Sequence, residues 1–105
     1  MSLRGKKLGL LLSICPEHPN FERGLNLAEA ALAQGVQVYL YCIDEAVAGV
    51  SHQRLQEIQR QGAKVYACAY GAHRRNLPVN DLATFAGLTI VSDLIAATDR
   101  FVSFN

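Results

Sequence analysis

A nearly continuous apolar run near the start of the chain constrains the fold most. It spans Leu8–Ile14, where aliphatic side chains are interrupted only by Gly9 and Ser13. A strand covered on one face alternates apolar and polar residues, whereas an unbroken run is typical of a strand covered on both faces of a parallel sheet. The run is also far shorter than the roughly 20 residues that a membrane-spanning helix needs. The sequence therefore predicts a buried parallel strand here.

The next segment has the features of an amphipathic helix. Asn20 is a favourable N-cap residue, and Gly35 stands where a left-handed C-terminal cap belongs. Between them, apolar side chains recur at the spacing of one helix face: Phe21, Leu25, Ala28 and Leu32. We expect a helix over Phe21–Gln34.

Strands and helices then continue to alternate. The pattern predicts a strand over Val36–Ile43, a helical turn over Asp44–Gly49, a helix capped by Ser51 that runs to Gln61, and a strand over Lys64–Cys68. This alternation is typical of an α/β domain with right-handed crossovers. Because the chain has 105 residues, we expect one domain over residues 1–105. We expect a three-layer sandwich with a mainly parallel sheet of roughly five strands and flavodoxin-like winding.

The last third of the chain gives a weaker pattern, because short polar segments separate its apolar residues. In chain order we expect a helix break at Pro78, a short helix capped by Asn80 or Asp81 that runs to Phe85, a helix capped by Thr89 with Val91, Leu94 and Ile95 on one face, and a last strand over Arg100–Phe104.

The three cysteines all lie near the carboxyl end of a predicted strand: Cys15 after the first, Cys42 in the second and Cys68 in the third. In flavodoxin-like order the first strand lies between the second and the third, and adjacent strands are about 4.8 Å apart. The three thiols would then share the carboxyl edge of the sheet, where ligands bind in such folds.

Cys68 differs from the other two thiols in the loop expected after it. Gly71 gives the backbone freedom, and His73, Arg74 and Arg75 bring positive charge, which stabilises a thiolate. The pattern predicts a nucleophilic Cys68, with the three basic residues as candidate assisting groups. A buried cysteine can equally be an inert small hydrophobe.

The other two thiols are secondary candidates. Cys42 lies within an apolar and aromatic strand, which favours a structural role. Cys15 begins a loop with His18 three residues on, but Pro16 and Glu17 between them add nothing that stabilises a thiolate. We treat Cys15 as either structural or a partner of Cys68.

Cofactor and metal chemistry have weak support in the sequence. Zinc could in principle use Cys15, His18, Cys68 and His73, but no Cys-x-x-Cys pair occurs. No Gly-x-Gly-x-x-Gly motif and no Walker loop are present to hold a dinucleotide or nucleotide. We therefore expect no metal and no organic cofactor.

Charge and cysteine number exclude further classes. A net charge of +1 gives no electrostatic basis for binding nucleic acid. An odd number of cysteines without framework spacing indicates reduced thiols, and no cleavage site follows the first apolar run. We expect a cytoplasmic protein with no membrane segment.

The order of elements also resembles the DsrE/DsrF-like family of small sulfur-relay proteins. The stretches that carry the resemblance are Gly24–Ala31, Gly35–Leu40, Asp44–Val47, Gly62–Cys68 and Ala97–Phe104. The resemblance implies a one-domain α/β protein that forms trimers or hexamers, or assembles with related subunits. It also implies that Cys68 corresponds to the cysteine that carries persulfide sulfur between partner proteins.

Two functions are consistent with these observations. In the first, Cys68 accepts sulfane sulfur as a persulfide and passes it to a partner thiol, with His73, Arg74 and Arg75 assisting. Whether this makes the protein a sulfurtransferase enzyme is left open. The alternative is a non-catalytic oligomeric module that binds a ligand or partner at the same sheet edge and has inert thiols.

Overall fold

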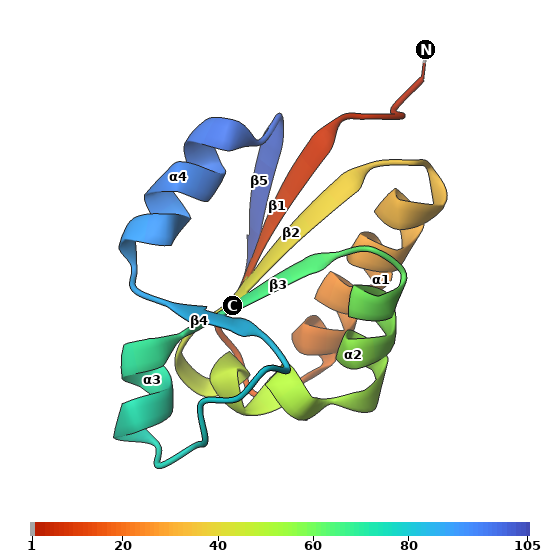
Figure 1. The fold of residues 1–105 in the computed structure, drawn as a ribbon. Coiled ribbons are helices and arrows are strands. Elements are labelled where there is room, and N and C mark those ends of the chain that lie inside the picture. Colours follow the sequence, from red (N-terminus) through yellow and green to blue (C-terminus); the bar gives the residue numbers. More distant parts are fainter. Residues whose placement is uncertain (1) are drawn as a thin grey trace.

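The computed structural model describes residues 2–105, and strands alternate with helices along this whole stretch (Figure 1). In chain order the elements are β1 (Lys7–Leu12), α1 (Pro19–Ala33), β2 (Gln37–Cys42), the 3-10 helix η1 (Asp44–Ser51), α2 (Gln53–Arg60), β3 (Lys64–Cys68), α3 (Ala69–Arg74), β4 (Thr84–Ala86), α4 (Thr89–Ala97) and β5 (Arg100–Phe104).

The strands form one parallel sheet in the order β4-β3-β2-β1-β5. At its centre Leu10 of β1 is in register with Leu40 of β2 and Val102 of β5. Helices α1 and α2 cover one face, and α4 lies on the other, with α3 below it at the carboxyl end of β3 (Figure 1). The expected α/β fold with a parallel sheet of about five strands is confirmed.

The strand order differs from the flavodoxin-like winding that we expected. Strand β2 lies between β1 and β3, whereas β1 lies between β2 and β5. The steps from β1 to β2 and from β2 to β3 run in the same direction, so right-handed crossovers place α1 and α2 on the same face of the sheet. Only the return to β5 reverses the direction. The order therefore reverses between β1 and β5.

Two histidines cap the helices of the first face. His18, not Asn20, caps α1: its Nδ1 accepts a hydrogen bond from the backbone N–H of Asn20 at 3.0 Å. His52, not Ser51, caps α2: its Nδ1 accepts from the backbone N–H of Arg54 at 3.1 Å. An imidazole nitrogen with a free lone pair can thus take the role of the usual Ser, Thr, Asn or Asp oxygen.

The expected secondary structure around Cys68 and Phe85 was wrong. Helix α3 begins directly after Cys68, where we expected a loop. Residues 84–86 form the short strand β4, not the end of a helix. Pairing with the exposed edge of β3 stabilises this three-residue strand. A local sequence pattern does not reveal such pairing with a distant segment.

The last two elements, α4 and β5, agree better with the prediction. Strand β5 has the expected bounds. Helix α4 begins at Thr89, which is its first residue, and Leu88 occupies the N-cap position. Of the expected apolar face, Leu94 is 6% exposed but Ile95 is 52% exposed. Within one protomer, therefore, only part of the expected apolar face of α4 is buried.

Candidate functional site at Cys68

Cys68 stands at the junction of β3 and α3. It is the last residue of β3, and its side chain is the N-cap of α3, where Sγ accepts a hydrogen bond from the backbone N–H of Gly71 at 3.3 Å. The side chain is only 3% exposed. The sulfur therefore lies at the carboxyl edge of the sheet, as expected, but beneath the first turn of a helix.

An apolar cluster surrounds this sulfur on the face of the sheet that carries α4. Its fully or almost fully buried members are Tyr41, Val47, Cys68, Ala72 and Leu94. The Tyr41 hydroxyl donates a hydrogen bond to the backbone carbonyl oxygen of Ala86 at 3.3 Å. Burial, followed by the neighbouring Cys68 thiol, raises the pKa of Tyr41 above its ordinary value, so the phenol stays protonated beside the sulfur.

The three basic residues that follow Cys68 lie at the other end of α3. His73, Arg74 and Arg75 are all exposed, and the Arg74 guanidinium lies 5.9 Å from the centre of the Tyr70 ring. Within residues 2–105 no hydrogen bond or ion pair joins them to the sulfur. Helix α3 is the reason, because it carries these residues away from its own N-cap.

Cys42 and Cys68 face opposite sides of the sheet. Cys42 is in register with Ala67, so Cys68, one residue further along β3, points the other way. Cys42 is 0% exposed and belongs to the larger core cluster beneath α1 and α2. Burial raises the pKa of Cys42 to about 12, so this thiol stays protonated and apolar in character.

Cys15 is partly exposed in the loop between β1 and α1. The strand order places β2 between β1 and β3, so Cys15 and Cys68 do not follow neighbouring strands. The three thiols still lie at the carboxyl edge on consecutive strands, but β2 is the central strand of the three, where we expected β1. The point where strand order reverses, between β1 and β5, lies on the Cys15 side of the sheet.

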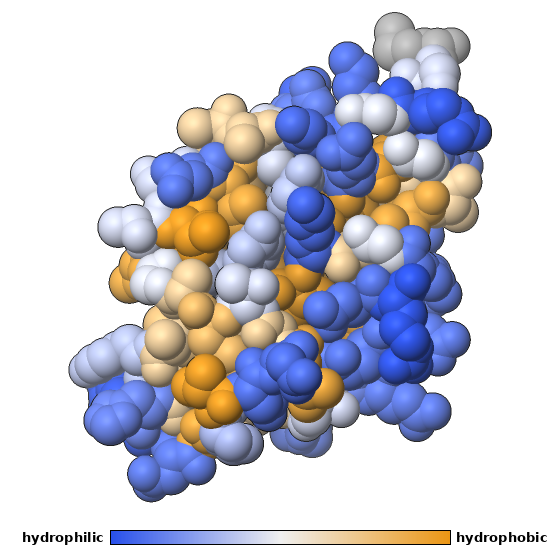
Figure 2. Space-filling model, in the orientation of Figure 1, coloured by the Kyte–Doolittle hydropathy of each residue, from blue (hydrophilic) through white to orange (hydrophobic). Residues whose placement is uncertain are grey.

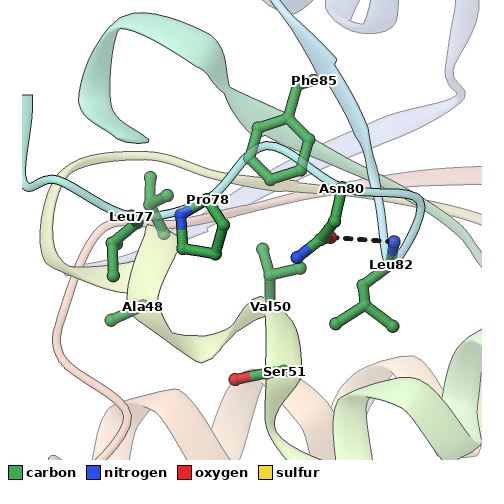
Figure 3. Close-up of a pocket in the computed structure, with 9 residues that line it drawn as sticks. Ala48, Val50, Ser51, Leu77, Pro78, Asn80, Leu82 and Phe85 are labelled. Atoms are coloured by element: carbon green, nitrogen blue, oxygen red, sulfur yellow. Dashed lines mark hydrogen bonds between the residues drawn. The ribbon is translucent and has the colours of Figure 1, made fainter. Parts of the chain in front are cut away.

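A small apolar cavity adjoins the Cys68 cluster (Figure 3). It holds about 60 Å³ and lies between η1 and the segment that links α3 to β4, with walls formed by Val47, Ala48, Val50, Ser51, Leu77, Pro78, Asn80, Leu82 and Phe85. Val47, Leu77 and Phe85 belong both to this wall and to the cluster around Cys68. No sequence pattern indicates the cavity, because its walls come from segments distant along the chain.

One glutamine holds the two walls of the cavity together. The Nε2 of Gln56 donates to the carbonyl oxygen of Val50 at 2.7 Å and to that of Leu82 at 2.9 Å. The Asn80 Oδ1 accepts a hydrogen bond from the backbone N–H of Leu82 at 3.0 Å, which shapes the turn (Figure 3). Gln56 is therefore a structural residue that joins the cavity walls, although it lies in a mostly polar helix.

Metal-binding and membrane-spanning features are absent from residues 2–105. No group of three or more His, Cys, Asp or Glu side chains in this part of the chain could hold a metal ion. In the same residues, no helix is both long enough and apolar enough to cross a bilayer.

The fold and the site together define a class: small α/β proteins with an all-parallel five-stranded sheet and a cysteine at the carboxyl end of the third strand. Within that class, residues 6–104 match the DsrE/DsrF-like family, so the chain belongs to this family. The recognition made from the sequence is confirmed.

Solved structures agree with this placement. The ychN protein from E. coli superposes with a TM-score of 0.81 at 18% identity, over 94% of this chain and 99% of that chain. A conserved protein of unknown function from Bacteroides thetaiotaomicron has a TM-score of 0.76 at 15% identity, over 93% of this chain and 94% of that chain. At these identities the likeness shows the fold. None of the curated proteins matches the sequence.

Proposed function

We propose that the protein is a sulfur-relay protein that accepts sulfane sulfur as a persulfide on Cys68 and passes it to a thiol of a partner protein. The observation that carries the proposal is the hydrogen bond from the Gly71 N–H to Cys68 Sγ at 3.3 Å. A donor N–H at the start of a helix stabilises negative charge on sulfur, either on a thiolate or on a persulfide. Membership of the family supports the same role.

The transfer balances without any cofactor. The Cys68 thiolate attacks the outer sulfur of a donor persulfide, the donor S–S bond breaks, and the donor thiolate leaves with the electron pair. The proton lost by Cys68 neutralises that leaving group. A partner thiolate later attacks the outer sulfur of the Cys68 persulfide in the same way, so sulfur moves with no net oxidation or reduction.

Within this proposal the other candidate residues have different roles. Tyr41 keeps a protonated hydroxyl beside the sulfur. His73, Arg74 and Arg75 do not contact Cys68 within one protomer. We therefore propose that they take no direct part in forming or breaking the S–S bond. Cys15 is a secondary thiol that could receive sulfur from another molecule. Because such chemistry needs free thiols, we place the protein in the cytoplasm.

The proposal also includes self-assembly, as a trimer or hexamer, or assembly with related subunits. Figure 2 shows hydrophobic side chains at the surface over α4 and below it toward α3. Leu88 and Ile95 are 58% and 52% exposed, and Val102 on the edge strand β5 is 37% exposed. Apolar side chains of this kind on adjacent elements support an interface with another subunit.

Intact mass measurement tests the relay directly. The wild type, Cys68→Ser and Cys15→Ser are each incubated with glutathione persulfide and weighed before and after addition of a reducing agent. We expect a gain of one sulfur atom, reversed by reductant, in the wild type and in Cys15→Ser but not in Cys68→Ser. Equal loading of Cys68→Ser and the wild type would overturn the proposal.

A second candidate function is a non-catalytic binding module with structural thiols. The 3% exposure of Cys68 favours it, because the thiol is covered in this conformation and a sulfur donor has access to it only when α3 moves. The rate of Cys68 alkylation by iodoacetamide in the folded Cys15→Ser protein separates the two functions. A rate that rises only under unfolding conditions favours the binding module, whereas reaction under native conditions favours the relay.

A further inference from the structure

We propose that the outer surface of α3 and the segment after it is the docking site for an acidic segment of the protein that exchanges sulfur with Cys68. This inference rests on the proposed function and names the chemistry of the partner. We define the α3 surface by five residues: Tyr70, His73, Arg74, Arg75 and Val79.

Exposed apolar groups and unpaired cations occur together on this surface. Tyr70 is 66% exposed and Val79 is 64% exposed, the two largest values among the exposed large hydrophobic residues of the described chain. The three basic side chains are exposed, and none forms an ion pair within residues 2–105. No Asp or Glu occurs anywhere between residues 64 and 80. An acidic segment is therefore the complement that this surface lacks.

The helix dipole accounts for basic residues at the end of α3, but it does not account for the exposed apolar residues of this surface. Basic residues in a last turn stabilise the helix dipole. That interaction does not require Tyr70 and Val79 to be exposed to solvent. The Arg74 guanidinium lies 5.9 Å from the centre of the Tyr70 ring, within the range of a cation–π contact, so the positive charge and the aromatic ring are neighbours on this surface. An Arg beside an exposed aromatic ring is typical of a protein-binding surface.

The apolar cavity extends this surface. Leu77 and Pro78, which lie between the last basic residue and Val79, form one wall of it (Figure 3). Its volume of about 60 Å³ fits the tip of one aliphatic side chain, not a cofactor. The partner segment should thus combine carboxylates with a single small apolar anchor. RNA fits poorly, because three cations neutralise few phosphates and an apolar cavity offers nothing to a base edge.

A partner docked on this surface would contact α3, the helix that covers the sulfur of Cys68. Only Gly71 and Ala72 of α3 are buried, and a Cβ at Gly71 would lie 3.2 Å from Val47 Cγ2 and 3.7 Å from Cys68 Sγ. A helix held by two small residues opens at low cost in free energy. A partner bound to the outer surface of α3 is therefore well placed to displace α3 and reach Cys68.

Two synthetic peptides test the inference in a Cys15→Ser background. Both carry one leucine and one cysteine activated as a thiopyridyl mixed disulfide, but one is rich in Glu and the other in Lys. Release of thiopyridone reports exchange with Cys68, and fluorescence anisotropy of the same peptides reports binding. We expect the acidic peptide to exchange about tenfold faster at low salt, with the difference shrinking as salt rises.

Charge reversal locates the effect. Arg74→Glu combined with Arg75→Glu should abolish the preference for the acidic peptide. Arg100→Glu, a single charge reversal at the opposite edge of the sheet, should leave it intact. Thermal unfolding by circular dichroism checks that each variant is folded. Equal exchange rates for the two peptides, or equal effects of the two variants, would overturn the docking site. So would an RNA oligonucleotide that binds as tightly as the acidic peptide.

The outcomes separate docking from sulfur transfer. If the acidic peptide binds in an Arg74-dependent manner but neither peptide exchanges, the docking site stands and the relay function fails. If both peptides exchange at the same rate, Cys68 is accessible and nucleophilic, as the relay requires, and the docking site fails.

Discussion

The backbone N–H of Gly71 donates to the Sγ of Cys68, so a thiol takes the place of the hydroxyl or carboxylate that usually caps a helix. Sulfur is a weak acceptor when protonated and a stronger one when charged. The stability of the first turn of α3 is therefore linked to the chemical state of Cys68.

This link predicts the hydrogen exchange of a single amide. Cys68→Ala removes the acceptor, so we expect the Gly71 amide to lose protection and the protein to lose about 1 kcal/mol of stability. Cys68→Ser keeps an acceptor and should keep most of the protection. Amide exchange followed by NMR measures both variants. Unchanged protection at Gly71 in Cys68→Ala would show that the sulfur does not act as a cap.

Alkaline destabilisation is expected from two buried acids. Burial raises the pKa of Cys42 to about 12 from its ordinary value of 9.0, and raises that of Tyr41 from 10.0. Above the ordinary pKa the unfolded state releases the proton while the native state keeps it, so the free energy of unfolding falls as pH rises. The slope is about 1.4 kcal/mol per pH unit for each group.

Urea unfolding in the presence of a phosphine reductant measures these slopes. Between pH 9 and pH 10 only the Cys42 contribution is active, so Cys42→Ala should flatten the curve there, even though the smaller side chain lowers stability at every pH. Above pH 10 Tyr41→Phe should flatten it instead. Identical slopes for the wild type and Cys42→Ala would contradict the burial argument.

The packing of η1 on α1 predicts a large effect of one methyl group. A Cβ on Gly49 would lie 2.5 Å from Cζ and 2.7 Å from Cε2 of Phe21, a ring that is only 1% exposed. Gly49→Ala should therefore destabilise the protein by about 1–3 kcal/mol through overpacking. At Gly87 the same methyl group would have no atom within 4 Å. Gly87→Ala is the matched control, and we expect a change close to zero in the same urea titration.

Elements with a strong local signal were predictable from the sequence. The bounds of β3 and β5 were correct because β-branched and aromatic residues fill these strands and turn residues bound them. Helix α1 was found from its apolar face, although His18 caps it. The sulfur at the end of β3 was correctly placed at the carboxyl edge of the sheet for the same reason.

The features that the sequence did not reveal depend on contacts between distant segments. Strand order is set by the direction of each crossover, for which no residue pattern exists, and β4 exists only because β3 offers a free edge. The basic residues near Cys68 were expected at its sulfur. Helix α3 carries them to its other end, because the Cys68 thiol begins a helix that ordinary capping rules do not anticipate.

The exposed apolar residues of α4 give the last prediction, which concerns assembly. Ile95 is 52% exposed on a helix whose inner face is already anchored by Leu94, so its outward position has no role inside one protomer. If α4 lies at a subunit interface, Ile95→Glu buries an unpaired carboxylate there and should shift the protein to a smaller species. Ala97→Glu, at an exposed position about 160° around the same helix from Ile95, is the charge-matched control. Sedimentation velocity of the wild type and both variants at several concentrations measures the effect. A wild type that sediments as a monomer, or an Ile95→Glu variant of unchanged size, would exclude α4 as the interface and leave its apolar surface to another partner.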